Sequence, residues 1–121
     1  MLGREDSQVL LVADRKASRA ARMLQRAGFE VVMTLTVDHA VAMCVNREFA
    51  AVVLDQELFV EVDGWSVAQS LKLVRRNICV VLVTRGVARN RRAPKGVDAQ
   101  VAQKDLAQLP GGVRRFRYPC N

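Results

Sequence analysis

Four side chains that together could bind Mg²⁺ and a phosphoryl group each follow a segment predicted to be a strand. They are Asp14, Asp55, Thr84 and Lys104, which come after the apolar runs at 8–12, 50–54 and 78–83 and after a short strand expected at 98–102. Two carboxylates beside a backbone carbonyl form a hard-oxygen site of the kind that Mg²⁺ prefers. An ammonium group neutralises a phosphoryl oxygen, and a hydroxyl group donates a hydrogen bond to one. These residue types indicate a metal and phosphate site, provided that the fold brings the four positions together.

The apolar runs at 8–12, 50–54 and 78–83 predict three of the strands that would position these side chains. These runs are continuous and rich in valine and leucine, which is typical of strands buried on both faces. A further strand is predicted at 30–34, and apolar residues at helical spacing predict helices between the strands, at 17–27 (ended by Gly28), 37–46 and 65–76. The segment 85–95 has little apolar periodicity and is either a short helix or a solvated loop. A short last helix is expected to begin near Pro110, because proline is tolerated at a helix start and costs about 3 kcal/mol inside one.

The alternation of strands and helices predicts the fold class. Strands joined by helices of this length pair in parallel through right-handed crossovers. We therefore expect an α/β fold, a doubly wound open sheet of five parallel strands with helices on both faces. Its 121 residues suit one domain. Ligands of such sheets bind beyond the carboxyl ends of the strands, where the four side chains would converge.

Composition indicates a cytoplasmic protein. No apolar stretch approaches the ~20 residues of a membrane helix, and the first residues lack the layout of a signal peptide. The cysteines are odd in number and have no Cys-x-x-Cys pair, so neither a zinc site nor a disulfide framework is predicted. Cys44 and Cys79 lie in apolar runs and are expected in the core, and Cys120 in an exposed tail.

Four segments of the sequence resemble the receiver domain of bacterial response regulators, of the chemotaxis type and with a flavodoxin-like (βα)5 fold. They are QVLLVADR, AAVVLDQEL with the later VDGW, VVLVTRG, and VDAQVAQK. The resemblance covers residues 7–117 and leaves 1–6 as an N-terminal extension and 118–121 as a C-terminal tail.

The resemblance implies a role for each candidate residue. Asp55 would accept a phosphoryl group from a histidine kinase or a phosphotransfer protein. Asp14, Asp55 and the backbone carbonyl of Glu57 would hold Mg²⁺, while Thr84 and Lys104 would contact the phosphoryl group. The resemblance implies a signalling protein and not an enzyme, apart from catalysis of its own phosphorylation and dephosphorylation.

The sequence departs from the receiver pattern at several positions. Ala13 replaces the first acid of the usual pair, which would weaken Mg²⁺ binding. The segment from Asp55 to Gly64 is one residue longer than usual, Lys104 is followed by Asp105 instead of proline, and an aromatic residue expected near Val101 is absent. A phosphorylation-independent pseudo-receiver that binds other proteins is therefore an open alternative. A nucleotide-binding flavodoxin-like protein is a weaker one, because no glycine-rich loop follows the first strand.

The charge of +7 is unevenly distributed. Eight cations and no acid occur between Gly64 and Val97: Lys72, Arg75, Arg76, Arg85, Arg89, Arg91, Arg92 and Lys95. Such a field attracts anions, and in receivers the face around the fourth helix is the usual partner surface. We expect an acidic effector to contact the basic face formed by Arg75, Arg76, Arg89, Arg91 and Arg92. Nucleic acid is not an expected partner, because no recognition helix or set of stacking aromatics is evident; a homodimer is left open.

Overall fold

The computed structural model describes residues 8–13, 19–55, 64–84 and 97–114 of the chain. Its elements, in order, are β1 (Gln8–Val12), α1 (Arg19–Arg26), β2 (Glu30–Thr34), α2 (Val37–Asn46), β3 (Ala51–Asp55), α3 (Gly64–Val74), β4 (Val80–Thr84), β5 (Ala99–Ala102), the 3-10 segment η3 (Gln103–Gln108) and α4 (Leu109–Arg114). The segment 85–95, for which a helix or a loop was expected, lies outside the described residues. None of the described helices combines the length and the apolar character needed to cross a membrane.

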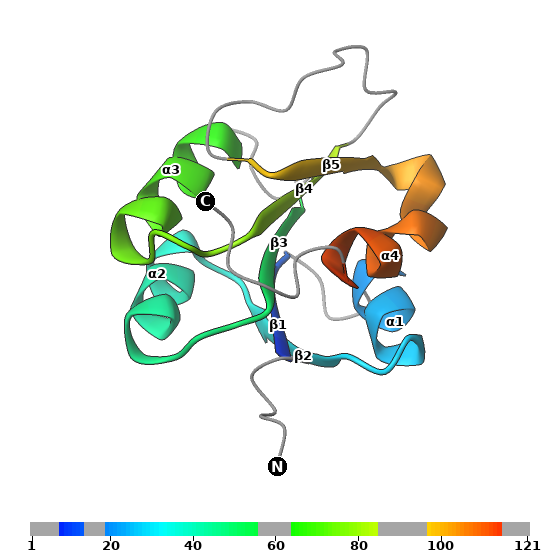
Figure 1. The fold of residues 1–121 in the computed structure, drawn as a ribbon, viewed down its shortest axis with the longest axis horizontal. Helices are drawn as coiled ribbons and strands as arrows, with labels where there is room; N and C mark the ends of the chain where they lie inside the picture. The colour runs from blue at the N-terminus through cyan, green and yellow to red at the C-terminus, as the bar shows by residue number, and fades with distance from the viewer. Residues whose placement is uncertain (1–7, 14–18, 56–63, 85–96, 115–121) are drawn as a thin grey trace.

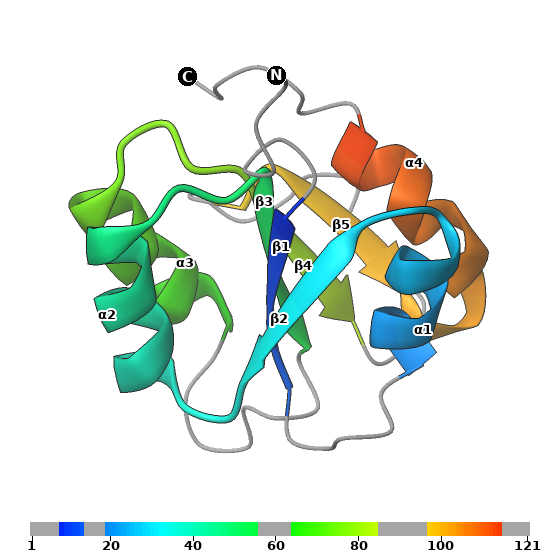
Figure 2. The same cartoon turned by 90° about the horizontal axis from the view of Figure 1, so that it is seen from below.

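The five strands form one parallel sheet in the order β2-β1-β3-β4-β5. Helices α2 and α3 cover one face of this sheet, and α1 and α4 cover the other (Figures 1 and 2). The predicted doubly wound sheet with helices on both faces is therefore confirmed.

Alternate residues of β1, β2, β3 and β4 contribute to two separate hydrophobic cores, whereas β5 contributes to one of them. Leu11 and Val53 belong to the core under α1 and α4, whereas Leu10 and Val52 belong to the core under α2 and α3. All four side chains are fully buried. Because both faces of the sheet are covered, β1, β3 and β4 are apolar at consecutive positions, which explains why continuous apolar runs located these strands.

Gly28 ends helix α1, as predicted. Its φ of 99° lies in the left-handed region, which costs glycine nothing. The N–H of Gly28 donates to the carbonyl of Gln25 at 3.0 Å, and the N–H of Phe29 donates to the carbonyl of Leu24 at 3.0 Å. This pair of bonds is the Schellman motif, which satisfies the last carbonyls of a helix. Phe29 packs against the same core as the buried Leu24, so the turn fixes the path from α1 into β2.

Cys44 and Cys79 are both buried, as the apolar runs predicted. Cys44 is free, and burial raises the pKa of its thiol to about 11 against the opposing effect of the Arg75 charge. Cys79 is disulfide-bonded, so the prediction that cysteines form no disulfide is wrong for this residue. The cysteines therefore give no support to the expectation of a cytoplasmic protein.

Candidate functional site

The carboxyl ends of β3 and β4 bring two of the predicted site residues to one edge of the sheet. Asp55 is the last residue of β3, and Thr84 is the last residue of β4. Asp55 pairs with Val83 in the register of the two strands, so Thr84 lies one residue farther along the neighbouring strand. Both side chains are half-buried. The sequence-based placement of Asp55 and Thr84 at neighbouring strand ends is confirmed.

Asp55 also lies where the connections of the sheet diverge. Strands β1 and β3 are neighbours, but α1 follows β1 on one face of the sheet and α3 follows β3 on the other (Figure 1). Divergent connections open a crevice at the carboxyl ends of the two strands, and ligands of doubly wound sheets bind in such crevices. The pairing of Val12 with Leu54 puts Ala13 and Asp55 at the next level of these two strands. A carboxylate at this position is suited to a hard cation or to nucleophilic attack.

Ala13, which the resemblance to receivers aligns with the first acid of their pair, is part of the core. Its side chain is 1% exposed and belongs to the core under α1 and α4. Its N–H donates to the carbonyl of Thr34 at 3.1 Å and so continues the pairing of β1 with β2. A methyl group offers no oxygen to a metal ion, so any cation at this edge has one carboxylate fewer to bind.

The other predicted site residues are described only in part. Lys104 lies in η3, which begins directly after β5, and β5 ends with Ala102 opposite Thr84. Its backbone is therefore at the same edge of the sheet, but its side chain is outside the described part. Asp14 and Glu57, two of the three predicted Mg²⁺ ligands, lie outside the described residues. Within the described ranges, no cluster of three metal-binding side chains occurs.

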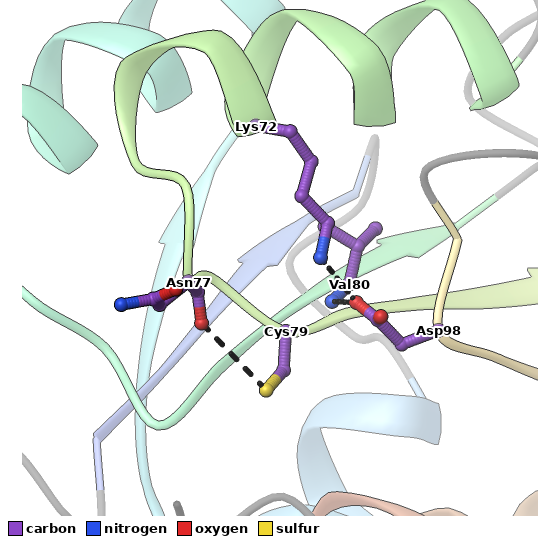
Figure 3. A network of polar contacts seen from close by, with 5 residues as sticks. All are labelled: Lys72, Asn77, Cys79, Val80 and Asp98. Atoms are coloured by element: carbon purple, nitrogen blue, oxygen red, sulfur yellow. Dashed lines mark hydrogen bonds and ion pairs between the residues drawn. The ribbon is translucent and has the colours of Figure 1, made fainter. Parts of the chain in front are cut away.

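Lys72 and Asp98 form an ion pair that the sequence did not predict. The Nζ of Lys72 donates to Oδ2 of Asp98 at 2.8 Å, and the N–H of Val80 donates to the same oxygen at 2.8 Å (Figure 3). The N–H of Asp98 in turn donates to the carbonyl of Val80 at 2.8 Å. Asp98 therefore links the start of β4 to the start of β5 by hydrogen bonds, at the amino ends of the strands, opposite the candidate site. The Sγ of Cys79 lies 4.0 Å from the carbonyl oxygen of Asn77 (Figure 3), and this contact has no thiol proton because Cys79 is disulfide-bonded.

Arg75, one of the arginines of the basic face expected from the sequence, contacts groups of α2 and Glu48. Its Nε donates to the carbonyl of Cys44 at 2.7 Å, and its Nη2 donates to the carbonyl of Val45 at 3.3 Å. Its Nη1 lies 3.4 Å from Oε1 of Glu48. The last carbonyls of a helix lack partners within it and carry partial negative charge, so a guanidinium group satisfies them well. The Arg75 side chain therefore caps α2, and its contact with an effector stays a prediction. Arg76 is exposed, and the other arginines of the expected face lie outside the described residues.

No protein-family model matches the chain, and no curated protein matches its sequence. Solved structures do match it. The receiver domain of a sensor histidine kinase from Pseudomonas aeruginosa PAO1, with a magnesium ion coordinated in its active-site cleft, has a TM-score of 0.74 at 20% identity, over 92% of this chain and 97% of that one. A response regulator protein from Thermotoga maritima in complex with Mg²⁺ and BeF has a TM-score of 0.75 at 20% identity, over 91% and 98%. A response regulator receiver domain protein from Clostridium thermocellum has a TM-score of 0.77 at 13% identity, over 92% and 94%. At these identities the likeness is one of fold.

Proposed function

We propose that this chain, whose fold is that of the response regulator receiver domains, is a two-component signalling receiver that accepts a phosphoryl group on Asp55. The observation that carries the proposal is the place of Asp55, at the carboxyl end of the central strand β3 where the connections diverge, with Thr84 at the end of the next strand. The phosphoryl donor would be a histidine kinase or a phosphotransfer protein. Two of the similar structures, one of them from a sensor histidine kinase, contain Mg²⁺.

In the proposed reaction a carboxylate oxygen of Asp55 attacks phosphorus, and the bond from phosphorus to the donor nitrogen breaks. Thr84 donates a hydrogen bond to a phosphoryl oxygen, and Lys104 neutralises another. Asp14, Asp55 and the carbonyl of Glu57 would hold Mg²⁺, which supplies charge neutralisation for the incoming oxygens. Phosphoryl transfer depends mainly on positioning and charge neutralisation, so the reaction needs no further catalytic side chain. The protein would catalyse only its own phosphorylation and dephosphorylation.

The buried Ala13 sets the expected metal dependence. With one carboxylate fewer, the site binds Mg²⁺ more weakly than a site with the acidic pair, so phosphorylation needs a higher Mg²⁺ concentration. Ala13→Asp would add the missing ligand, at the cost of placing a carboxylate in a core position that is 1% exposed. We expect this variant to be less stable without Mg²⁺ and to gain more stability than the unmutated protein when Mg²⁺ is added.

Incubation with acetyl phosphate and Mg²⁺, followed by mass spectrometry of the intact protein, tests the function. The unmutated protein should gain one phosphoryl group, and Asp55→Asn should gain none. Lys104→Ala should retain some labelling but lose the conformational response, which NMR spectra would record. If the folded, unmutated protein takes up no phosphoryl group at any Mg²⁺ concentration, the proposed function is wrong.

A pseudo-receiver that binds partners without phosphorylation is the second candidate, and the packing of Ala13 favours it. A receiver that had lost its chemistry but kept its fold would carry an apolar, buried residue at a metal-ligand position, as this chain does at Ala13. On this alternative, beryllofluoride with Mg²⁺ leaves the NMR spectrum of the protein unchanged. A change confined to residues near Asp55 and Thr84 would argue for the phosphorylated receiver instead.

A further inference from the structure

The outer face of helix α1 carries a row of three arginines, Arg19, Arg22 and Arg26, which we call the arginine row. All three side chains are exposed, while Ala20, Ala21 and Leu24 of the same helix are buried against the sheet. Positions three and four residues apart lie on one side of a helix. At 1.5 Å per residue the row is about 10 Å long.

The arginine row has no counter-charge in the described part of the chain. None of its guanidinium groups forms a hydrogen bond or an ion pair there, whereas Lys72 and Arg75 each have an acidic partner. The sequence from 15 to 29 contains no acid. Like charges three and four residues apart repel one another, and Arg19 lies in the first turn, where the helix dipole disfavours a cation. An anion bound along the row would relieve both effects.

We propose that the arginine row binds the phosphate backbone of double-stranded DNA without regard to base sequence. A guanidinium group makes paired hydrogen bonds to a phosphate, and all but four of the 19 cationic side chains of this protein are arginines. With a sequence pI of about 10.2, the whole chain attracts polyanions, and the row offers them cations that no described residue neutralises. This activity is separate from phosphorylation of Asp55.

The composition of the α1 surface favours a duplex backbone over other anionic partners. The exposed large hydrophobic residues of the described part, Leu35, Val45 and Leu73, lie outside α1. Protein interfaces centre on apolar and aromatic residues, membrane-bound helices insert apolar ones, and single strands stack on aromatic rings. The outer face of α1 presents arginines and no exposed large apolar or aromatic residue. The lack of stacking aromatics, which spoke against nucleic acid at the sequence level, does not bear on binding to a duplex backbone, because that binding needs cations alone.

Fluorescence anisotropy with a labelled DNA duplex of mixed sequence, measured over a range of NaCl concentrations, tests the proposal. The test variant combines Arg19→Gln, Arg22→Gln and Arg26→Gln, and glutamine keeps a similar helix propensity. The control combines Arg89→Gln, Arg91→Gln and Arg92→Gln and so loses the same net charge. In the row variant, the slope of log K against log salt should fall by about 3, with an affinity at least about tenfold lower at low salt. The control should keep most of the slope.

Three results would overturn the proposal. The first is no binding of the unmutated protein to the duplex at low salt, and the second is an equal loss of slope in both triple variants, which would assign binding to diffuse net charge. The third is a row-dependent preference for polyglutamate over the duplex, which would assign the row to an acidic protein. Circular dichroism checks that the variants are folded. If the row variant is not folded, the arginine Nε–H NMR signals of the unmutated protein decide the matter: duplex DNA should shift those of Arg19, Arg22 and Arg26, and unchanged signals refute the contact.

Discussion

Replacing Arg75 with glutamine tests whether this side chain fixes α2 in place. Arg75 donates to two terminal carbonyls of α2, those of Cys44 and Val45, and its pair with Glu48 is a third contact. A hydrogen bond that involves a charged group contributes about 1.5–3 kcal/mol. The bond to the Val45 carbonyl is long, at 3.3 Å. The Glu48 side chain is 67% exposed, so the Arg75–Glu48 ion pair contributes about 0–1 kcal/mol at most. We expect Arg75→Gln to lower the free energy of unfolding by about 2 kcal/mol.

Thermal unfolding followed by circular dichroism measures this loss. An unfolding entropy of about 2.1 cal/mol/K per residue gives roughly 250 cal/mol/K for a chain of this size, so ~2 kcal/mol corresponds to a Tm lower by about 8 °C. Arg76→Gln is the matched control, because Arg76 is the next residue, carries the same charge and is exposed. It should change the stability by about 0.5 kcal/mol or less. Equal shifts of Tm in the two variants would refute the capping role of Arg75.

Substitutions at three further positions test other parts of the structure. Gly28→Ala should cost about 1–2 kcal/mol, because φ is 99° and the added methyl meets no atom within 4 Å, so only the backbone conformation is penalised; a neutral result in urea unfolding would contradict the left-handed turn. Burial raises the pKa of Cys44 from 9.0 to about 11, so the folded state holds the thiol proton more tightly than the unfolded state, and this contribution to stability is complete below pH 9 and lost as the pH rises to 11. Cys44→Ala should flatten the decline of stability between pH 9 and 11, and an unchanged decline would show that other groups cause it. Asp98→Asn removes the charge pair with Lys72 but keeps an acceptor for the N–H of Val80, whereas Asp98→Ala loses both and should cost about 1–3 kcal/mol more; equal losses in the two variants would show that the bond to Val80 contributes nothing.

The positions of the strands could be predicted from the sequence because burial on both faces demands consecutive apolar residues. The boundaries were less accurate for the same reason. The apolar run before Thr84 begins at Ile78, but β4 begins at Val80, since Ile78 and Cys79 are buried before the strand starts. A run of apolar residues therefore indicates which residues are buried. It indicates where a strand begins only if burial and strand pairing begin at the same residue.

Asp55 and Thr84 could be placed from the sequence because parallel strands end at a common edge. The role of Arg75 could not, because its acceptors are backbone carbonyls 30 and 31 residues away in the chain. Carbonyls are present at every residue and leave no signature in the sequence, and only the packing of α3 beside α2 brings them within reach. The same holds for Asp98, whose two partners are known only once β4 and β5 are aligned.

The order of the sheet also has a consequence for the synthesis of the chain. β1 is made before the other described strands, yet it lies between β2 and β3, and its residue Val9 pairs with Ala51 about 40 residues later. At about 5–20 residues per second, a ribosome needs roughly 2–8 s to make the intervening segment. During this interval β1 can pair with β2, but its other edge has no partner, and unpaired apolar edges promote aggregation. A ribosomal pause between β2 and β3 would prolong that exposure and reduce the yield of folded protein.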